Sequence, residues 1–209
     1  MSKLALLTGG SRGIGKATAE MLRERGWTVE APRRAELDMS DTIEAAHYAR
    51  MFGRFMPDIQ ALIFCHGSWH SEESQRTRDY SDQLAQRVLA PLILITHLFA
   101  DSVVMVASTQ AFGGRRKTGP YACACAAQVR LIQGLAQSKN GRRYNVVCPG
   151  LTDTAMAAQV RASGDCAPDA VAQPVSAVAA AIVGLIESDA NGKVLRVVDG
   201  VTTEARWSW

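Results

Sequence analysis

Short apolar runs alternate along the chain with longer segments in which apolar residues recur at helical spacing. The short runs predict strands over residues 4–8, 27–31, 61–65, 102–107, 144–148 and 194–198, with a further short strand closing at Leu37 and Asp38. The longer segments predict helices over residues 13–25, 41–56, 81–100, 120–138, 154–162 and 175–188. This alternation is typical of an α/β fold, so we predict a doubly wound parallel sheet of about seven strands.

The length of 209 residues favours a single domain over residues 1–209, and no internal repeat or flexible linker divides the chain. Only residues 32–37 separate the second predicted strand from the third. A helical crossover between parallel strands needs about a dozen residues or more. We therefore expect the domain to be shortened between its second and third strands.

Composition and charge exclude several classes of protein. The chain is 47% hydrophobic and 21% charged, with 17 Gly and 7 Pro, which excludes disordered and collagen-like chains. The formal charge of +3 is too weak to indicate nucleic acid as the main partner. The longest apolar stretch, residues 88–99, is too short to span a membrane, and the N-terminal apolar run is too short for a signal peptide.

Cysteine usage indicates a reducing compartment. The five cysteines are Cys65, Cys123, Cys125, Cys148 and Cys166, an odd number without the paired spacing of a zinc site. We therefore expect reduced thiols, a cytoplasmic protein and no metal.

A glycine-rich turn follows the first predicted strand and opens the first helix. It reads Thr8-Gly9-Gly10-Ser11-Arg12-Gly13-Ile14-Gly15. A tight turn at such a junction lets backbone N–H groups and the helix N-terminus face a pyrophosphate. We predict a dinucleotide phosphate site here; the alternative is a turn that binds no ligand.

This turn and several later motifs resemble the short-chain dehydrogenase/reductase family over nearly the whole chain. The other matching segments are Asp38-Met39, Ser108 with Tyr121 thirteen positions later, and Asn145-Val146-Val147-Cys148-Pro149-Gly150-Leu151-Thr152-Asp153-Thr154. Phe64-Cys65-His66-Gly67 stands where the family usually has N-N-A-G, of which only the glycine is kept. The resemblance implies a Rossmann-like fold, with Tyr121 as the catalytic acid and Ser108 orienting the substrate oxygen. The cofactor site that it implies comprises Gly9, Ser11, Arg12, Gly13, Ile14, Gly15, Asp38, Met39, Cys65, His66, Gly67, Pro149, Gly150, Thr152 and Thr154.

Charge at the end of the second predicted strand indicates which dinucleotide binds. An acidic residue there would bind the ribose hydroxyls of NAD, whereas arginine pairs with the 2′-phosphate of NADP. The position falls on Arg33, followed by Arg34, and Arg12 in the glycine turn is placed to help. We predict NADP(H); the alternative is that Arg33 and Arg34 only solvate a loop.

Two positions depart from the family pattern. The resemblance implies a lysine four residues after the tyrosine, which depresses the tyrosine pKa and binds ribose, but this position is Cys125. It also implies a catalytic asparagine, and matching Ala90-Pro91 to the family places Arg87 there. One hypothesis is compensation, in which the Arg87 guanidinium replaces the missing ammonium. The other is that the site has drifted, so that cofactor binds but carbonyl reduction is slow or absent.

Two more side-chain types near the site have open roles. His66 either acts as an acid or base near neutral pH or satisfies a local hydrogen bond, and we favour the hydrogen bond. Cys125 is the one thiol that we expect to face a ligand, whereas Cys65, Cys123 and Cys148 are expected to be small buried side chains.

Residues 152–175 resemble the mobile lid of the family. Their small and apolar character suggests a small, mainly hydrophobic or aromatic carbonyl or alcohol substrate. We expect either the substrate cleft under this lid or a subunit contact to be lined by Trp69, His70, Trp207 and Trp209.

The sequence thus predicts an NADP(H)-dependent reductase. The alternative is a non-redox protein of the same fold, such as a cyclase, isomerase, dehydratase or cofactor-binding scaffold. The apolar helices predicted over residues 81–100 and 120–138 fit pairing between subunits, so we expect a homodimer or homotetramer.

Overall fold

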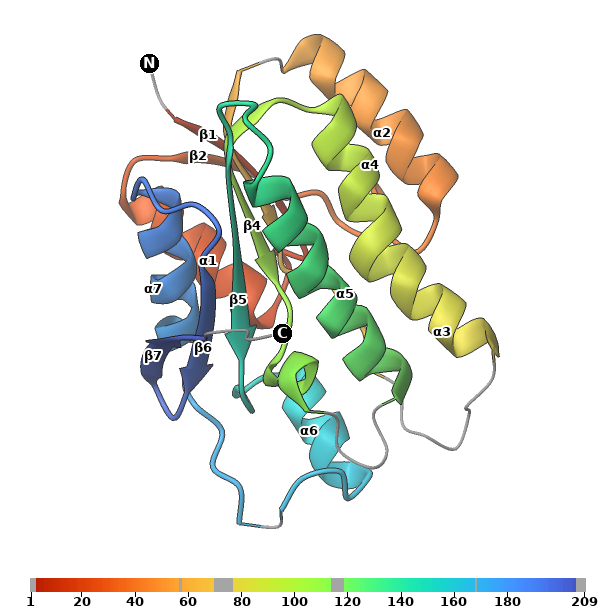
Figure 1. Ribbon diagram of the computed structural model, residues 1–209, viewed down its shortest axis with the longest axis vertical. Helices are drawn as coiled ribbons and strands as arrows, with labels where there is room; N and C mark the ends of the chain where they lie inside the picture. The colour runs from red at the N-terminus through yellow and green to blue at the C-terminus, as the bar shows by residue number, and fades with distance from the viewer. Residues whose placement is uncertain (1–2, 57, 70–76, 114–118, 168, 206–209) are drawn as a thin grey trace.

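One sheet of seven strands, in the order β2-β1-β3-β4-β5-β6-β7, forms the centre of the molecule (Figure 1). The computed structural model describes residues 3–56, 58–69, 77–113, 119–167 and 169–205. The strands are β1 Leu4–Thr8, β2 Thr28–Glu30, β3 Ile59–Phe64, β4 Ala100–Val106, β5 Arg143–Pro149, β6 Val194–Val198 and β7 Val201–Glu204. β1 to β6 are parallel, and β7 pairs antiparallel with β6. This confirms the predicted α/β class and the number of strands.

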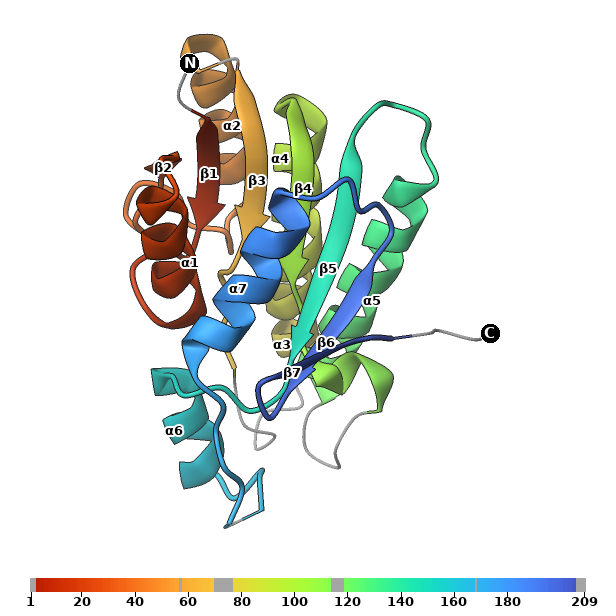
Figure 2. The ribbon, with the colours of Figure 1, turned by 90° about the vertical axis from the view of Figure 1, so that its left-hand side faces the viewer.

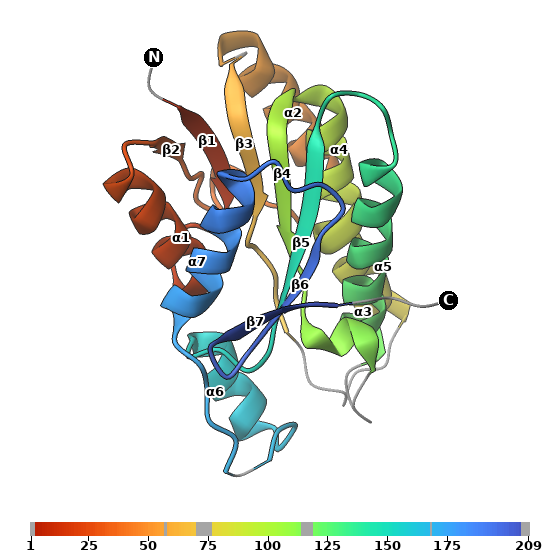
Figure 3. The same ribbon diagram turned by 60° about the vertical axis from the view of Figure 1, so that its left-hand side comes forward.

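Helices cover both faces of the sheet (Figures 2 and 3). They are α1 Gly13–Glu24, α2 Thr42–Phe55, α3 Thr77–Leu84, a π-helix Ala85–Leu89, α4 Ala90–His97, a 3₁₀-helix Thr109–Phe112, α5 Gly119–Ala136, α6 Ala155–Ala162 and α7 Val175–Ile186. α1 and α7 pack together on one face, and α2, α4 and α5 lie on the other. None of the helices in the described part of the chain is long and apolar enough to cross a membrane.

The core has two layers, one on each face of the sheet. Side chains alternate along a strand, so the neighbours Leu6 and Leu7 of β1 enter opposite layers. Leu6 shares its layer with Leu94 of α4 and Ile132 of α5, whereas Leu7 shares its layer with Leu22 of α1. Burial on both faces explains why the central strands read as continuous apolar runs.

The short strand predicted at Leu37 and Asp38 does not form. This segment is a turn that leads into α2, whose first turn is capped by the Asp41 carboxylate, which accepts from the N–H groups of Ile43 (2.8 Å) and Glu44 (3.1 Å). Leu37 is buried in the core, so the apolar position that indicated a strand serves packing instead. The shortening predicted between the second and third strands rested on that strand and is wrong as stated, because β2 and β3 are joined through the helix α2.

The seventh strand is β7 instead, which follows a turn at Asp199 (φ 51°) and Gly200 (φ 77°). All four residues of β7 are exposed, so the strand buries no face against the core. Its sequence therefore lacks the alternation of apolar and polar residues that predicts a strand. The helix predicted over residues 81–100 begins earlier and is interrupted by the π-helix, and its last part ends at His97.

Asn145 connects β5 to the loop before β6 from a completely buried position. Its Nδ2 donates to the Ala190 carbonyl at 2.7 Å, and its Oδ1 accepts from the Lys193 N–H at 2.9 Å. Asn145→Ala leaves both backbone groups without these partners, so we expect urea denaturation to show the free energy of unfolding reduced by roughly 2–4 kcal/mol. The exposed control Asn140→Ala should lose less than about 1 kcal/mol. Equal losses of unfolding free energy in the two variants would contradict the stabilising role assigned to the buried Asn145 hydrogen bonds.

Candidate active site

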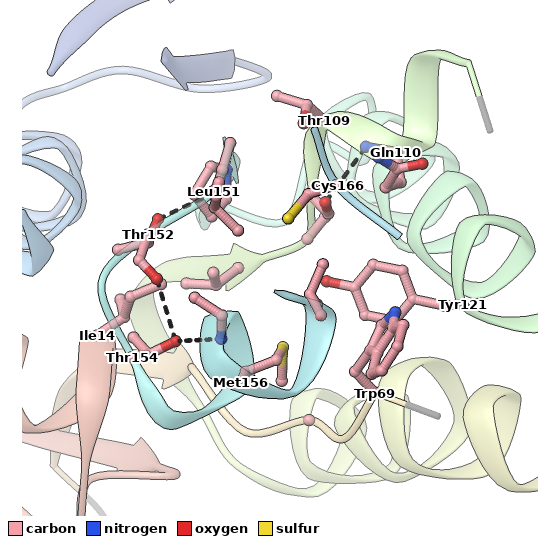
Figure 4. Close-up of a pocket in the computed structure, with 18 of the residues that line it drawn as sticks. Ile14, Trp69, Thr109, Gln110, Tyr121, Leu151, Thr152, Thr154, Met156 and Cys166 are labelled. Carbon is pink, nitrogen blue, oxygen red and sulfur yellow. Dashed lines mark hydrogen bonds between the residues drawn. The ribbon is translucent and has the colours of Figure 1, made fainter. Parts of the chain in front are cut away.

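A pocket lies where β3, β4 and β5 end, beside the start of α1 (Figure 4). In open α/β sheets, ligands bind outside the carboxyl ends of the strands. Of the predicted site residues, those that line the pocket are Ile14, Cys65, His66, Gly67, Arg87, Ser108, Tyr121, Pro149, Gly150, Thr152 and Thr154. Those that do not line it are Gly9, Ser11, Arg12, Gly13, Gly15, Arg33, Arg34, Asp38, Met39 and Cys125.

The glycine turn packs tightly against the end of β3. Gly9 has a φ of +78°, and a Cβ there would lie 2.6 Å from the backbone nitrogen of His66. A Cβ on Gly15 would lie 2.2 Å from the carbonyl oxygen of Gly9. Gly9 and Gly15 therefore have to be glycine. At the N-terminus of α1, the Arg12 side chain makes no capping hydrogen bond. A turn and helix start of this form fit the pyrophosphate of a dinucleotide.

The arginines predicted to select the cofactor lie on the surface beyond β2. Arg33 pairs with Glu36 at 3.1 Å, and Arg34 pairs with Asp38 at 3.0 Å. Burial would raise the pKa of Asp38, but hydrogen bonds from Ser40 and the pairing with Arg34 outweigh it and lower that pKa. Exposed ion pairs are weak, so both guanidinium groups are able to exchange partners for a phosphate.

The segment resembling a lid is fastened at its base by Gln173. The Gln173 side chain donates to the Val197 carbonyl at 2.8 Å and to the Thr152 hydroxyl at 3.2 Å. Its backbone N–H donates to the Leu151 carbonyl, and the Asp153 N–H donates to its carbonyl, both at 2.9 Å. The segment between these points, which includes α6, therefore forms a closed loop along one side of the pocket.

Ser108 and Tyr121 meet at the other side of the pocket. Ser108 follows β4 and its hydroxyl caps the 3₁₀-helix, accepting from the Gln110 N–H at 3.2 Å. Tyr121 stands in the first turn of α5 and lines the same pocket as Ser108. Burial and the adjacent Cys125 raise the pKa of Tyr121 to about 12, although Arg87 and Ser108 act to lower it. The phenol therefore keeps its proton at neutral pH.

Arg87 on the π-helix lies against Tyr121 and is only 3% exposed. Its guanidinium carbon is 4.5 Å from the centroid of the Tyr121 ring. Nε donates to Gln83 Oε1 at 3.0 Å, and Nη2 donates to the Ser68 carbonyl at 3.1 Å. A Cβ on Gly67 would lie 2.4 Å from Nη2, so glycine at this position gives the guanidinium its space. No ion pair of Arg87 is found within the described residues.

The family model described as short chain dehydrogenase matches residues 35–165, more than half of the chain. The chain belongs to the short-chain dehydrogenase family. A comparison with curated proteins finds none that matches this sequence.

Solved structures at low sequence identity share the fold of this short-chain dehydrogenase. ElxO with NADP bound is 20% identical, with a TM-score of 0.83 over 96% of this chain and 98% of that chain. A variant of actinorhodin polyketide ketoreductase with NADPH is 19% identical, with a TM-score of 0.83 over 95% and 97%. A short chain dehydrogenase from Burkholderia cenocepacia J2315 in complex with NADP is 24% identical, with a TM-score of 0.79 over 95% and 97%.

The cysteine that this short-chain dehydrogenase has in place of the implied lysine does not face the pocket. Cys125 is completely buried one turn after Tyr121, which corrects the expectation of exposure to a ligand. Burial raises the pKa of Cys125, so the thiol is neutral at pH 7 and supplies no positive charge to Tyr121. Cys65 and Cys166 line the pocket instead, and Cys123 is exposed rather than buried, because it lies on the outer face of α5.

His66 bridges β1 and the π-helix. Its Nδ1 is 2.6 Å from the Thr8 hydroxyl, and its Nε2 is 2.5 Å from the Gln86 carbonyl. A carbonyl only accepts hydrogen bonds, so Nε2 carries the proton and Nδ1 accepts from Thr8. Burial lowers the pKa of His66 to about 4, with Arg87 acting in the same direction. The ring is therefore neutral near pH 7 and serves the local hydrogen bonds that we favoured from the sequence.

Several residues around the site were not identified from the sequence. They are Ser68 and Gln83, which hold Arg87, and Gln110 and Thr109, which line the pocket beside Ser108. Gln83 precedes Arg87 by four residues, a spacing that places two helical side chains on the same face. This spacing is the feature of the sequence from which the contact between Gln83 and Arg87 could have been predicted. His70, Trp207 and Trp209 lie outside the described residues. Among those described, no group of three or more His, Cys, Asp and Glu side chains is arranged to hold a metal.

The low pKa of His66 predicts a pH-dependent stability. The pKa of histidine in the unfolded chain is about 6.5, so between pH 6.5 and 4 the unfolded chain binds more protons than the folded one. This contribution to stability is complete above pH 6.5 and is lost as the pH falls toward 4, by roughly 3 kcal/mol. Urea denaturation across this range should show a steeper loss for the natural protein than for His66→Asn.

The matched control for that measurement is His47→Asn, which changes an exposed histidine on α2. It should lose stability with the same pH slope as the natural protein. If His66→Asn and the natural protein have equal slopes, His66 is not the buried neutral group described above.

Proposed function

We propose that this protein is an NADPH-dependent reductase of a carbonyl compound, with Tyr121 as the proton donor and Ser108 orienting the oxygen. The observation that carries the proposal is that Ser108 and Tyr121 line one pocket beside the glycine turn, close enough for Ser108 to lower the pKa of the phenol. In the reaction, the Tyr121 hydroxyl would donate its proton to the carbonyl oxygen while the carbonyl carbon takes up the hydride that bound NADPH would supply, giving an alcohol and NADP⁺. Solvent then returns a proton to Tyr121.

The cofactor assignment is supported by the turn, the surface arginines and the structural neighbours that were crystallised with NADP or NADPH. Bound NADPH supplies the hydride. The glycine turn would hold the pyrophosphate, and Arg33, Arg34 and Arg12 would bind the 2′-phosphate. Asp38 and Met39 would contact adenine, and the residues near nicotinamide would be Cys65, His66, Gly67, Pro149, Gly150, Thr152 and Thr154.

The protonation state of Tyr121 favours reduction over alcohol oxidation. With a pKa raised to about 12, the phenol holds its proton at neutral pH and is ready to donate it. The developing alkoxide is a stronger base than a phenolate, so the transfer remains favourable. Oxidation of an alcohol requires the phenolate instead, which burial disfavours.

We infer that Arg87 provides the positive charge that the family pattern assigns to lysine. Its guanidinium lies against Tyr121 and lowers the pKa of that phenol, although burial has the larger effect. Cys125 supplies no positive charge and acts in the opposite direction, raising the pKa of Tyr121. That neutral thiol is also the observation that favours the alternative, a protein of this fold that binds the cofactor without the redox step.

We further propose a cytoplasmic homodimer or homotetramer. The five cysteines are all free, which suits a reducing compartment. Leu89 and Phe99, at either end of α4, are about half exposed, which suits a contact between subunits near this helix.

Arg33→Glu tests the choice of cofactor. A carboxylate at this position repels the 2′-phosphate, so we expect the Kd for NADPH to rise at least about tenfold, while the Kd for NADH changes little. Isothermal titration with both cofactors measures the difference. The control Arg50→Glu makes the same charge change on the exposed side of α2 and should preserve both affinities. Equal weakening by the two variants would show that Arg33 only solvates its loop.

Tyr121→Phe and Arg87→Ala test the chemistry. Loss of the proton donor should reduce kcat for NADPH-dependent carbonyl reduction by about 10²–10⁴-fold without weakening NADPH binding. Loss of the Arg87 charge should reduce kcat by roughly tenfold or more, because Tyr121 becomes a weaker acid when its pKa rises. Full turnover in Arg87→Ala, with turnover lost in Tyr121→Phe, would refute compensation. Circular dichroism checks that both variants fold.

A further inference from the structure

Six of the residues that line the pocket have uncharged, mainly apolar side chains. We call this part of the lining the apolar half; it is formed by Trp69, Leu151, Met156, Val160, Cys166 and Ala170. Trp69 follows β3, whereas Met156 and Val160 belong to α6, so the apolar half is built from both sides of the pocket. Figure 4 shows Trp69 and Tyr121 among the side chains that line the pocket.

The position of the Ser108–Tyr121 pair determines how a substrate enters this space. Because these two hydroxyl groups and the apolar half line the same pocket, a carbonyl compound whose oxygen accepts from the hydroxyl groups can place a substituent against the apolar half. The substituent then meets an indole ring, the thioether of Met156 and the thiol of Cys166. An indole prefers offset or edge-on contact with another π system, and sulfur prefers contact with the edge of an aromatic ring.

We propose that the substrate of this site is an uncharged aryl ketone or aldehyde, whose aromatic ring is recognised by Trp69, Met156 and Cys166. The proposal rests on the carbonyl reduction assigned to Tyr121 above and specifies the compound that is reduced. A saturated ring of similar size gains the same apolar burial but lacks the aromatic and sulfur contacts. The site therefore distinguishes the two rings.

The charges around the pocket favour a neutral substrate over a carboxylate. The Arg87 guanidinium is directed to Gln83, the Ser68 carbonyl and the Tyr121 ring, and is not one of the groups of the apolar half. The charged residue on the lid side of the pocket is Asp165, which is acidic and accepts from the Ser163 hydroxyl at 2.6 Å. An anionic group placed beside the lid would be repelled.

A pair of probes with the same carbonyl group isolates the aromatic ring. Acetophenone carries a phenyl ring and cyclohexyl methyl ketone carries a saturated ring of similar size. Isothermal titration of each ketone into the protein loaded with NADP⁺ gives Kd values without any turnover. We expect acetophenone to bind about tenfold more tightly, the effect of about 1.4 kcal/mol. Benzoylformate, an aryl ketone with a carboxylate, should bind more weakly than acetophenone.

Variants of the apolar half assign the preference to its residues. Trp69→Leu should reduce the preference for acetophenone to about twofold or less, and Trp69→Phe should retain most of it. Val160→Ala, which enlarges the apolar half, should weaken both ketones alike. The matched control is Val171→Ala, because Val171 lies on the same lid segment but is 81% exposed and does not line the pocket. This control should leave both Kd values unchanged.

The outcomes separate this proposal from the proposed function. Any of three results would overturn the aryl substrate: equal Kd values for the two ketones, tighter binding of benzoylformate than of acetophenone, or a preference for acetophenone that persists in Trp69→Leu. NADPH-dependent reduction of other carbonyl compounds would then still support the proposed reductase. If NADP⁺ does not bind, the cofactor assignment is wrong. The same ketone titrations on the protein alone then still decide whether the apolar half recognises an aromatic ring.

Discussion

The buried guanidinium of Arg87, stacked against Tyr121, is the interaction on which the rest of the site depends. A charge inside a protein is costly unless its hydrogen bonds are satisfied. Gln83, the Ser68 carbonyl and the face of the Tyr121 ring satisfy Arg87, and the missing side chain of Gly67 gives it space. These partners come from α3, the segment after β3 and α5, so one buried charge fixes three elements around the pocket.

The π-helix connects this charge to the cofactor side of the pocket. Gln86 and Arg87 are neighbours in sequence and both are buried. A π-helix changes the hydrogen-bond pattern of a helix locally, and here the Gln86 carbonyl accepts from His66, whose ring also reaches Thr8 at the end of β1. The neutral His66 ring therefore holds the glycine turn, the end of β3 and the Arg87 helix together without adding a second positive charge beside Arg87.

The sequence predicted the parts that depend on local patterns, and missed the parts that depend on tertiary packing. The strands buried on both faces and the glycine turn leave clear local signals, so β1, β3, β4 and β5 lie close to their predicted positions. Leu37 has the apolar character of a strand but packs into the core from a turn. Cys125 is buried in the core rather than at the pocket, and no residue spacing indicates this depth. Resemblance identified position 87, whereas only the structure shows what holds its side chain.

Turnover of the natural protein beside Cys125→Lys tests the central claim, that Arg87 takes the part of the missing lysine. Each protein is titrated with NADPH, and oxidation of NADPH is then followed at 340 nm against a panel of carbonyl compounds. We predict that both bind NADPH, that the natural protein reduces at least one carbonyl, and that the added lysine gives no gain, because it places a second cation beside Arg87. NADPH binding without turnover in the natural protein, with turnover appearing in Cys125→Lys, would contradict the claim and identify a reductase that has lost its chemistry.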